Sequence, residues 1–316
     1  VALGRVVAVK RPREGSAGAK EARALVAEAL ITGSLEHPNV IPVYEMDVDA
    51  AGSPVLAMKR IEGEPWSRLL GDPDAVRARS PSEPLVFHLK VFCAVCDAVH
   101  FAHSRGVLHR DIKPDHVLVG HFGEVYLADW GIACASGAVT RISGTPAYMA
   151  PEMLTCEDLS ARIDVYLLGA VLFELLTGEA PHRGATSQAL LASILVSDVS
   201  VPASVPDELA ELLGACLARD PAKRPESAHA LRLRIDAFLE HRGSTALAAR
   251  ADLLAVELAS KIARDVVRAS VYETFTECRF AYREALRSWP DNTHARAGLR
   301  AVVERMLDRE LASGDL

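Results

Sequence analysis

The sequence predicts an α+β fold of two lobes, a small strand-rich lobe followed by a larger helical lobe, with a helical segment at the C-terminal end. Three observations support this prediction. Short β-branched stretches occupy residues 1–62, and apolar residues at helical spacing dominate residues 63–240. Mixed-charge helical sequence covers residues 245–316, after a Gly-Ser pair at 243–244 that indicates a boundary.

The first lobe is expected to contain three strands and one helix. The stretch VVAVK at 6–10 predicts the first strand, and the stretches at 40–46 and 55–58 predict the other two. Apolar residues recur at helical spacing over 20–35. Pro38 ends that helix, because the residue before a proline disfavours the helical conformation.

The second lobe is expected to be mainly helical. A long apolar helix is predicted at 85–104, and two short strands at 117–119 and 125–128 flank a glycine turn. Further helices are predicted at 163–177, 186–196, 207–218 and 226–240.

Composition and charge exclude several classes of protein. Half of the 316 residues are hydrophobic and 24% are charged, which is typical of a folded globular chain. The formal net charge is −7 and no basic run is present, so nucleic acid is not expected as a partner. No stretch reaches the roughly 20 apolar residues that span a bilayer, so no membrane span is expected.

The six cysteines are scattered and form no disulfide framework, which favours a reducing cytoplasm. Cys93 and Cys96 form a CxxC pair, but they lie within the predicted apolar helix. No second Cys/His pair has zinc spacing. We therefore interpret this pair as core packing rather than as a redox or metal site.

Four motifs follow one another along the chain. They are VAVK at 7–10, HRDIKP at 109–114, DWG at 129–131 and GTPAYMAPE at 144–152. With these motifs in this order, the chain resembles the eukaryotic-like serine/threonine protein kinases of bacteria over roughly residues 1–240. The resemblance implies a two-lobed protein kinase-like fold that phosphorylates protein hydroxyls in bacterial signalling, with ATP and Mg²⁺ or Mn²⁺ as cofactors.

The resemblance gives three residues roles in the chemistry. Asp111 is expected to orient the substrate hydroxyl and accept its proton, and Lys113 to stabilise charge on the transferring phosphoryl group. Asp129 is expected to bind Mg²⁺, a hard cation that prefers carboxylate oxygens. Trp130 replaces the usual phenylalanine and is expected to fill the same position.

The phosphate end of a nucleotide site is implied by a lysine on a strand. Lys10 is expected to hold the α- and β-phosphates and to pair with Glu28 of the following helix. Glu21 is the competing partner on that helix, and Glu28 is also open to interpretation as a solvated surface charge.

The adenine end is implied by positions whose side chains carry little information. Adenine is expected to lie between Ala8 and Leu118, next to Met58, and to bond backbone groups of Lys59 and Ile61. As ordinary core residues, Ala8 and Leu118 would look the same in the sequence.

Structural and regulatory roles are implied for a further set of residues. Glu152 is expected to pair with Arg224, and Asp164 to anchor the catalytic loop from the start of a buried helix. Arg110 is expected to pair with a phosphorylated activation loop. The candidate phosphosites are Thr140 and Ser143, whereas Thr145 of GTPAY is assigned to substrate binding.

Two departures from the family pattern bear on catalysis. A GxGxxGxV loop is expected roughly fifteen residues before VAVK, but the chain begins nine residues before Lys10 and offers only Gly4. This departure predicts weaker binding of Mg-ATP. His116 replaces the asparagine of HRDxxxxN, and imidazole is a poor Mg²⁺ ligand that Mn²⁺ tolerates better. Catalysis is therefore predicted to be impaired, and the alternative is a pseudokinase that acts as a scaffold or binding module.

The C-terminal segment carries a weak repeat pattern. Cys278, Tyr282, Ala285 and Pro290 have the spacing of the second helix of a tetratricopeptide repeat, and 297–299 has the composition to begin another. The alternative is a helical extension packed on the preceding lobe or on a partner. A protein partner is therefore expected at these helices.

Overall fold

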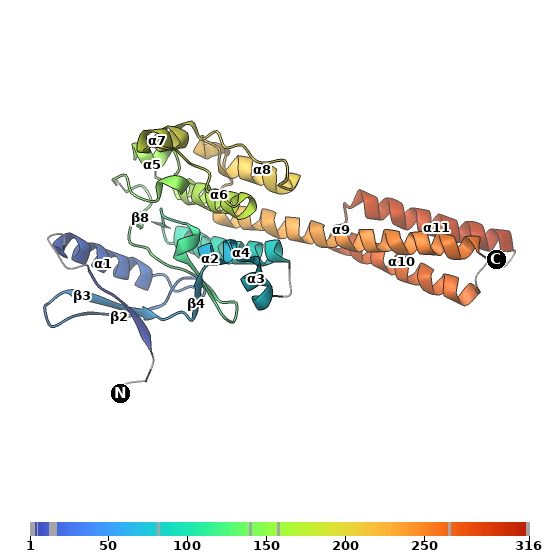
Figure 1. The fold of residues 1–316 in the computed structure, drawn as a ribbon, viewed down its shortest axis with the longest axis horizontal. Coiled ribbons are helices and arrows are strands. Elements are labelled where there is room, and N and C mark those ends of the chain that lie inside the picture. The colour runs from blue at the N-terminus through green and yellow to red at the C-terminus, as the bar shows by residue number, and fades with distance from the viewer. Residues whose placement is uncertain are drawn as a thin grey trace. The chain divides into compact units, whose positions relative to one another are not determined.

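The computed structural model describes residues 4, 6–12, 18–80, 83–138, 141–156, 159–264 and 267–313. The chain divides into two compact units, Val1–Ile235 and Asp236–Leu316. Figure 1 shows strands and helices of the first unit and the helices of the second. The predicted α+β organisation with a small strand-containing lobe and a helix-rich remainder is confirmed.

The first lobe is a three-stranded antiparallel sheet with one helix. The strands are β1 (Val7–Lys10), β2 (Val43–Val48) and β3 (Pro54–Lys59), in the order β1-β3-β2. Helix α1 (Gly18–Gly33) packs on the sheet through Leu25 and Ala29, which form a small core with Leu56 of β3. The predicted first strand and helix are thereby confirmed.

The second predicted strand begins later than the sequence indicated. It was expected at 40–46, but β2 runs from Val43 to Val48, and Val40 forms an isolated bridge with Leu127. The amide of Ile41 also donates to the carbonyl of Leu127, at 3.2 Å. Val40 and Ile41 are both buried, so their β-branched character reflects packing against the second lobe rather than membership of the first sheet.

The second lobe is mainly helical and holds the larger core. Its helices and strands are β4 (Gly63–Pro65), α2 (Trp66–Leu70), α3 (Pro73–Arg79), α4 (Pro84–Ser104), β5 (Val107–Leu108), β6 (Val117–Gly120), β7 (Val125–Leu127), β8 (Cys134–Ala135), α5 (Glu152–Thr155), α6 (Ala161–Thr177), α7 (Ser187–Val196), α8 (Asp207–Cys216) and the start of α9 (Ala228–Ala263). Short 3₁₀ turns lie at Pro114–His116, Pro146–Tyr148 and Pro221–Lys223. Helix α6 is almost wholly buried, and Ser160 caps its start by accepting a hydrogen bond from the amide of Arg162.

Helix α4 is the one described helix long and apolar enough to cross a membrane by length and composition. The sequence had predicted no such stretch. Ten of its side chains are nevertheless buried within the lobe, including Cys93 and Cys96. A core helix passes the same test of composition, and the burial of this helix identifies it as one.

The second unit contains the rest of α9 together with α10 (Arg268–Ser288) and α11 (Thr293–Ser313). The predicted boundary at Gly243–Ser244 is wrong as a helix break, because α9 continues through both residues. Ser244 is fully buried, donates its hydroxyl to the carbonyl of Ala285 at 2.8 Å and accepts from the Asn292 amide at 2.9 Å. These tertiary bonds outweigh the weak helix preference of a Gly-Ser pair.

The predicted repeat residues of α10 lie on its buried face. Cys278, Tyr282 and Ala285 belong to the core of the second unit, and Gly298 of α11 faces the Tyr282 ring. A Cβ added at Gly298 would lie 2.5 Å from Cε1 of that ring, so α11 can approach α10 only with a glycine there. The tetratricopeptide identity of the segment stays a prediction.

Gly298→Ala is expected to destabilise the chain. Alanine normally improves a helix interior by about 1 kcal/mol over glycine, but forced overlap with Tyr282 costs about 1–3 kcal/mol, so the free energy of unfolding should fall. Gly243→Ala is the matched control, because a Cβ there would meet nothing within 4 Å and only the helix preference changes. Urea unfolding followed by circular dichroism distinguishes them. Equal midpoints for the two variants would contradict the close approach of α11 to Tyr282.

Candidate active site

A cavity of about 380 Å³ opens beside the sheet of the first lobe. Its lining comes from β1, α1, β2 and β3, from Ile41 before β2 and residues 60–61 after β3, and from β6 and the segment that follows β7. All seven residues predicted to contact the nucleotide line it: Ala8, Lys10, Glu28, Met58, Lys59, Ile61 and Leu118. Its volume lies within the range of small-molecule sites.

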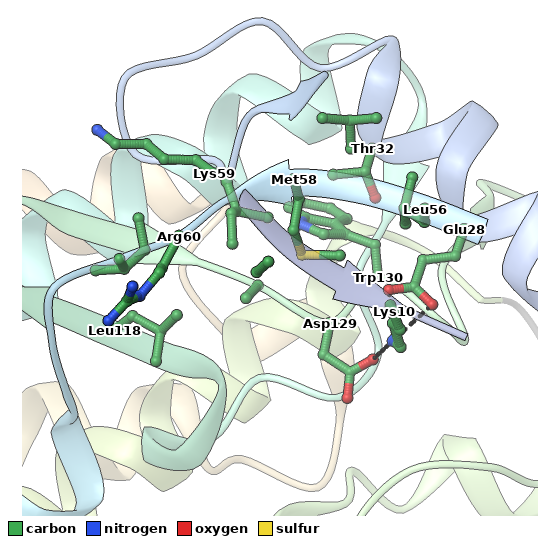
Figure 2. A pocket seen from close by; sticks show the side chains of 15 residues that line it. Lys10, Glu28, Thr32, Leu56, Met58, Lys59, Arg60, Leu118, Asp129 and Trp130 are labelled. Atoms are coloured by element: carbon green, nitrogen blue, oxygen red, sulfur yellow. Dashed lines mark hydrogen bonds and ion pairs between the residues drawn. The ribbon is translucent and has the colours of Figure 1, made fainter. Parts of the chain in front are cut away.

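The apolar end of the cavity is formed across two strands. Ala8 of β1 pairs in register with Met58 of β3, and Leu118 of β6 lines the same space. The Lys59 side chain points away from the cavity in Figure 2 and donates to the Tyr126 hydroxyl. The Lys59 side chain therefore does not enter the cavity, and its amide donates to the carbonyl of Pro42 at 2.9 Å. Contact of adenine with the Lys59 backbone stays a prediction.

The polar end is organised around Lys10. Its Nζ lies 2.7 and 2.8 Å from the two carboxylate oxygens of Glu28 and 3.2 Å from Oδ1 of Asp129 (Figure 2). Burial lowers the pKa of Lys10, but the two carboxylates outweigh burial and raise it, so the ammonium keeps its charge. Glu28 is only 7% exposed, and it is Glu28 rather than Glu21 that meets the lysine.

Asp129 is held in a conformation that few residues adopt. Its φ is +61°, in the left-handed region, and it is the second residue after β7. A Cβ at Gly131 would lie 3.2 Å from both Oδ1 of Asp129 and Oε2 of Glu28, so the glycine makes room for the two carboxylates. The hydrogen bond from His116 and the charge of Lys10 lower the pKa of Asp129 far below its usual range. Asp129 is therefore an ionised candidate metal ligand.

His116 does more than replace an asparagine. Its Nε2 lies 3.1 Å from Oδ2 of Asp129, and its Nδ1 lies 2.8 Å from the backbone carbonyl of Asp111. A carboxylate and a carbonyl only accept, so both contacts are hydrogen bonds only when both ring nitrogens carry a proton. The His116 ring thus lies against the Asp129 oxygen that Lys10 leaves open. The sequence indicated a weak metal ligand at this position but not a side chain that already contacts Asp129.

The predicted catalytic residues lie together. Oδ1 of Asp111 accepts from the Thr145 amide at 2.8 Å and from the Thr145 hydroxyl at 2.7 Å. Lys113 Nζ donates to the Thr145 hydroxyl at 2.7 Å and lies 3.4 Å from Oδ2 of Asp111. Thr145 therefore fixes one oxygen of Asp111, and Oδ2 faces a cation.

Arg110 holds the segment that was predicted to be phosphorylated. It has a left-handed backbone, φ +69°, and a buried side chain. Its guanidinium donates to the carbonyls of Ile132 and Arg141 and to the Ser143 hydroxyl at 3.0 Å. Ser143 thus meets the predicted partner without being modified, whereas Thr140 lies outside the described residues.

The residues that were assigned structural roles make contacts that match those roles. Asp164 is fully buried and accepts from the amides of His109 and Arg110 at 2.8 Å each, and Nε2 of His103 lies 2.8 Å from its Oδ2. Burial raises the pKa of Asp164, but the bonds from His103 and the backbone outweigh it and lower the pKa. The two carboxylate oxygens of Glu152 accept hydrogen bonds from the two terminal nitrogens of Arg224, whose side chain is fully buried.

The residues around Asp129 fit a metal ion that takes most of its ligands from substrate phosphates and water. Among the described residues, no three His, Cys, Asp or Glu side chains gather to form a protein cage for an ion. Mg²⁺ is commonly held by one or two carboxylates together with substrate phosphates. Asp129 suits that role, and His116 does not.

Comparison with protein families matches residues 2–234 to the protein kinase domain. The serine/threonine-protein kinase PknD of Chlamydia caviae is 32% identical over 267 residues, which are 75% of this chain and 28% of that protein. PknD of Chlamydia trachomatis serovar L2b is 32% identical over 291 residues, which are 81% of this chain and 31% of that protein. PknD of Protochlamydia amoebophila is 29% identical over 248 residues, which are 68% of this chain and 25% of that protein. The chain spans less than a third of the length of these relatives.

Asp164→Asn is expected to lower the free energy of unfolding by about 1–3 kcal/mol. Both oxygens of Asp164 accept backbone amides, so an asparagine must turn its own N–H₂ toward a donor. Asp111→Asn is the control, because the asparagine oxygen can still accept both Thr145 donors. Thermal unfolding checks the difference.

The stabilisation by Asp164 also has a defined pH dependence. Because the folded pKa is lowered, the stabilisation is complete above the unfolded value, about 3.9, and is lost as pH falls toward the folded pKa. The difference in free energy of unfolding between the parent and Asp164→Asn should therefore narrow only on strong acidification. A gap that is absent at neutral pH would contradict the anchoring role.

Proposed function

The chain belongs to the protein kinase domain family, and from this premise we propose that it transfers the γ-phosphoryl group of ATP to serine or threonine hydroxyls of proteins. The relatives named above support the choice of serine and threonine. We place the activity in bacterial signalling in the cytoplasm. ATP, a divalent cation and protein substrates are its proposed ligands.

One observation carries the proposal. Lys10, Glu28 and Asp129 come from β1, α1 and the segment after β7, yet they meet within one hydrogen-bonded cluster at the end of an apolar cavity. A purine would fill the apolar end and place its phosphates at this cluster. There the ammonium of Lys10 attracts the α- and β-phosphates, and Glu28 fixes the direction of the ammonium.

Asp111 and Lys113 are proposed to act on the second substrate. Thr145 holds Oδ1 of Asp111, which leaves Oδ2 to accept the proton of the attacking hydroxyl. The hydroxyl oxygen bonds to the γ-phosphorus as the bond to the β,γ-bridging oxygen breaks, and ADP leaves. Lys113 stabilises the negative charge on the transferring group. Mg²⁺ at Asp129 would neutralise charge on the phosphates.

His116 is proposed to reduce this activity. Its Nε2 lies 3.1 Å from the oxygen of Asp129 that a metal would use, so a metal must displace this contact, and imidazole is a poor replacement ligand for Mg²⁺. The same contact supports the second candidate function, a pseudokinase that binds partners without transferring phosphate. The two functions differ in whether the chain transfers phosphate at all.

Asp111→Asn and Asp129→Asn are each expected to lower phosphotransfer at least about 100-fold, because they remove the proton acceptor and the metal ligand. Asp115→Asn, an exposed position in the same loop, is the matched control and should retain activity. Transfer of ³²P from ATP to casein measures the effect. A parent chain that transfers no phosphate with either Mg²⁺ or Mn²⁺ would contradict the enzyme and support the pseudokinase.

His116→Asn is expected to lower the Mg²⁺ concentration for half-maximal phosphotransfer by about tenfold, because Asp129 loses a competing contact and gains a neighbouring amide oxygen. The advantage of Mn²⁺ over Mg²⁺ should shrink in parallel. His121→Asn, at an exposed position in the turn after β6, is the matched control. Identical magnesium titrations for parent and His116→Asn would show that His116 does not limit metal binding.

A further inference from the structure

One face of α10 in the second unit combines positive charge with an exposed aromatic ring. Arg279, Arg283 and Arg287 follow one another at one-turn spacing, and all three are exposed. Phe280 lies beside them and is 65% exposed. With Thr276 and Glu284 these residues line a hollow of about 480 Å³. We call this surface the α10 groove.

The opposite face of α10 explains why the groove is a free surface within its unit. Val271, Cys278 and Ala285 point into the core that α10 shares with α9 and α11. The core requires this orientation, so it also fixes the arginine row on the outer side. Helix packing within the unit leaves the row uncovered.

The charges of the groove are not balanced locally. Arg287 has Glu284 at 3.8 Å, but Arg279 and Arg283 have no carboxylate partner among the described residues. Elsewhere in the unit Arg268, Arg300 and Arg309 each pair with a glutamate. Like charges one turn apart disfavour a helix, so an uncompensated row is a cost that an anionic ligand would remove.

We propose that the α10 groove binds an extended acidic segment of a partner protein. Neighbouring arginines of the row are about 6 Å apart along the helix, and alternate residues of an extended strand are about 6.6 Å apart. Carboxylates at alternate positions therefore match the row, and each arginine can take one in a bidentate pair. Phe280 provides an apolar contact for a side chain between them.

The surroundings of the row favour an acidic peptide over other polyanions. Glu273 and Glu277 are exposed on the same helix, and Glu284 lies within the groove. A nucleic-acid backbone carries a charge on every nucleotide and extends beyond the row, so it would also meet Glu273 and Glu277, whereas a short acidic segment can end at the row. A helix that binds a membrane surface needs a wide apolar face, whereas Phe280 is the one apolar side chain lining the groove.

Fluorescence anisotropy of the full chain with a labelled peptide tests the proposal. The peptide carries glutamate at alternate positions, serine between them and one phenylalanine. Arg283→Glu is expected to weaken binding about tenfold, and Phe280→Ser to weaken it without changing the charge. Arg250→Glu is the matched control, an exposed arginine of α9 outside the groove, and should change affinity less than about twofold. Circular dichroism verifies that each variant is folded.

Three outcomes would overturn the proposal: no peptide binding by the parent chain, an equal loss in Arg283→Glu and Arg250→Glu, or tighter Arg283-dependent binding of single-stranded RNA or phosphatidylserine vesicles. None of these measurements involves phosphotransfer. The groove and the proposed kinase activity can therefore fail independently.

Discussion

The buried carboxylate of Asp164 is the constraint on which the candidate site depends. It lies in the first turn of α6, inside the core of the second lobe, and accepts the backbone amides of His109 and Arg110. An ionised group without solvent is tolerated only where donors surround it. Arg110 adopts its left-handed backbone at this point, and Asp111 follows directly. The position of the proposed catalytic carboxylate is thus set by a residue that does not face the cavity.

A second carboxylate, Asp129, joins the two lobes at the cavity. Lys10 of the first lobe and His116 of the second lie against its two oxygens. The contacts of Lys10 and His116 lower the pKa of Asp129, but they also occupy the atoms that a metal would use. The site therefore balances two demands: the carboxylate must stay charged, and it must be free to exchange a hydrogen bond for a metal bond.

Much of the site could be predicted from the sequence, because its residues lie in short motifs whose types and order reflect the chemistry. The pairing of Glu152 with Arg224 was predicted in this way, whereas for Lys10 the sequence left Glu21 open beside Glu28, and the structure shows the contact with Glu28. The contacts of His116 could not be predicted, because the direction of an imidazole depends on the fold of its loop. The continuation of α9 through Gly243 and the late start of β2 were also hidden, since tertiary bonds decided both.

The central claim is that a nucleotide-bound metal lies at Asp129, next to His116. Paramagnetic broadening of imidazole NMR signals by Mn²⁺ with ATP tests it most directly. The account predicts strong broadening of the His116 resonances, while those of His182, which is buried against Tyr166 and Ser193, stay sharp. Sharp His116 resonances at saturating Mn²⁺ and ATP would contradict the account.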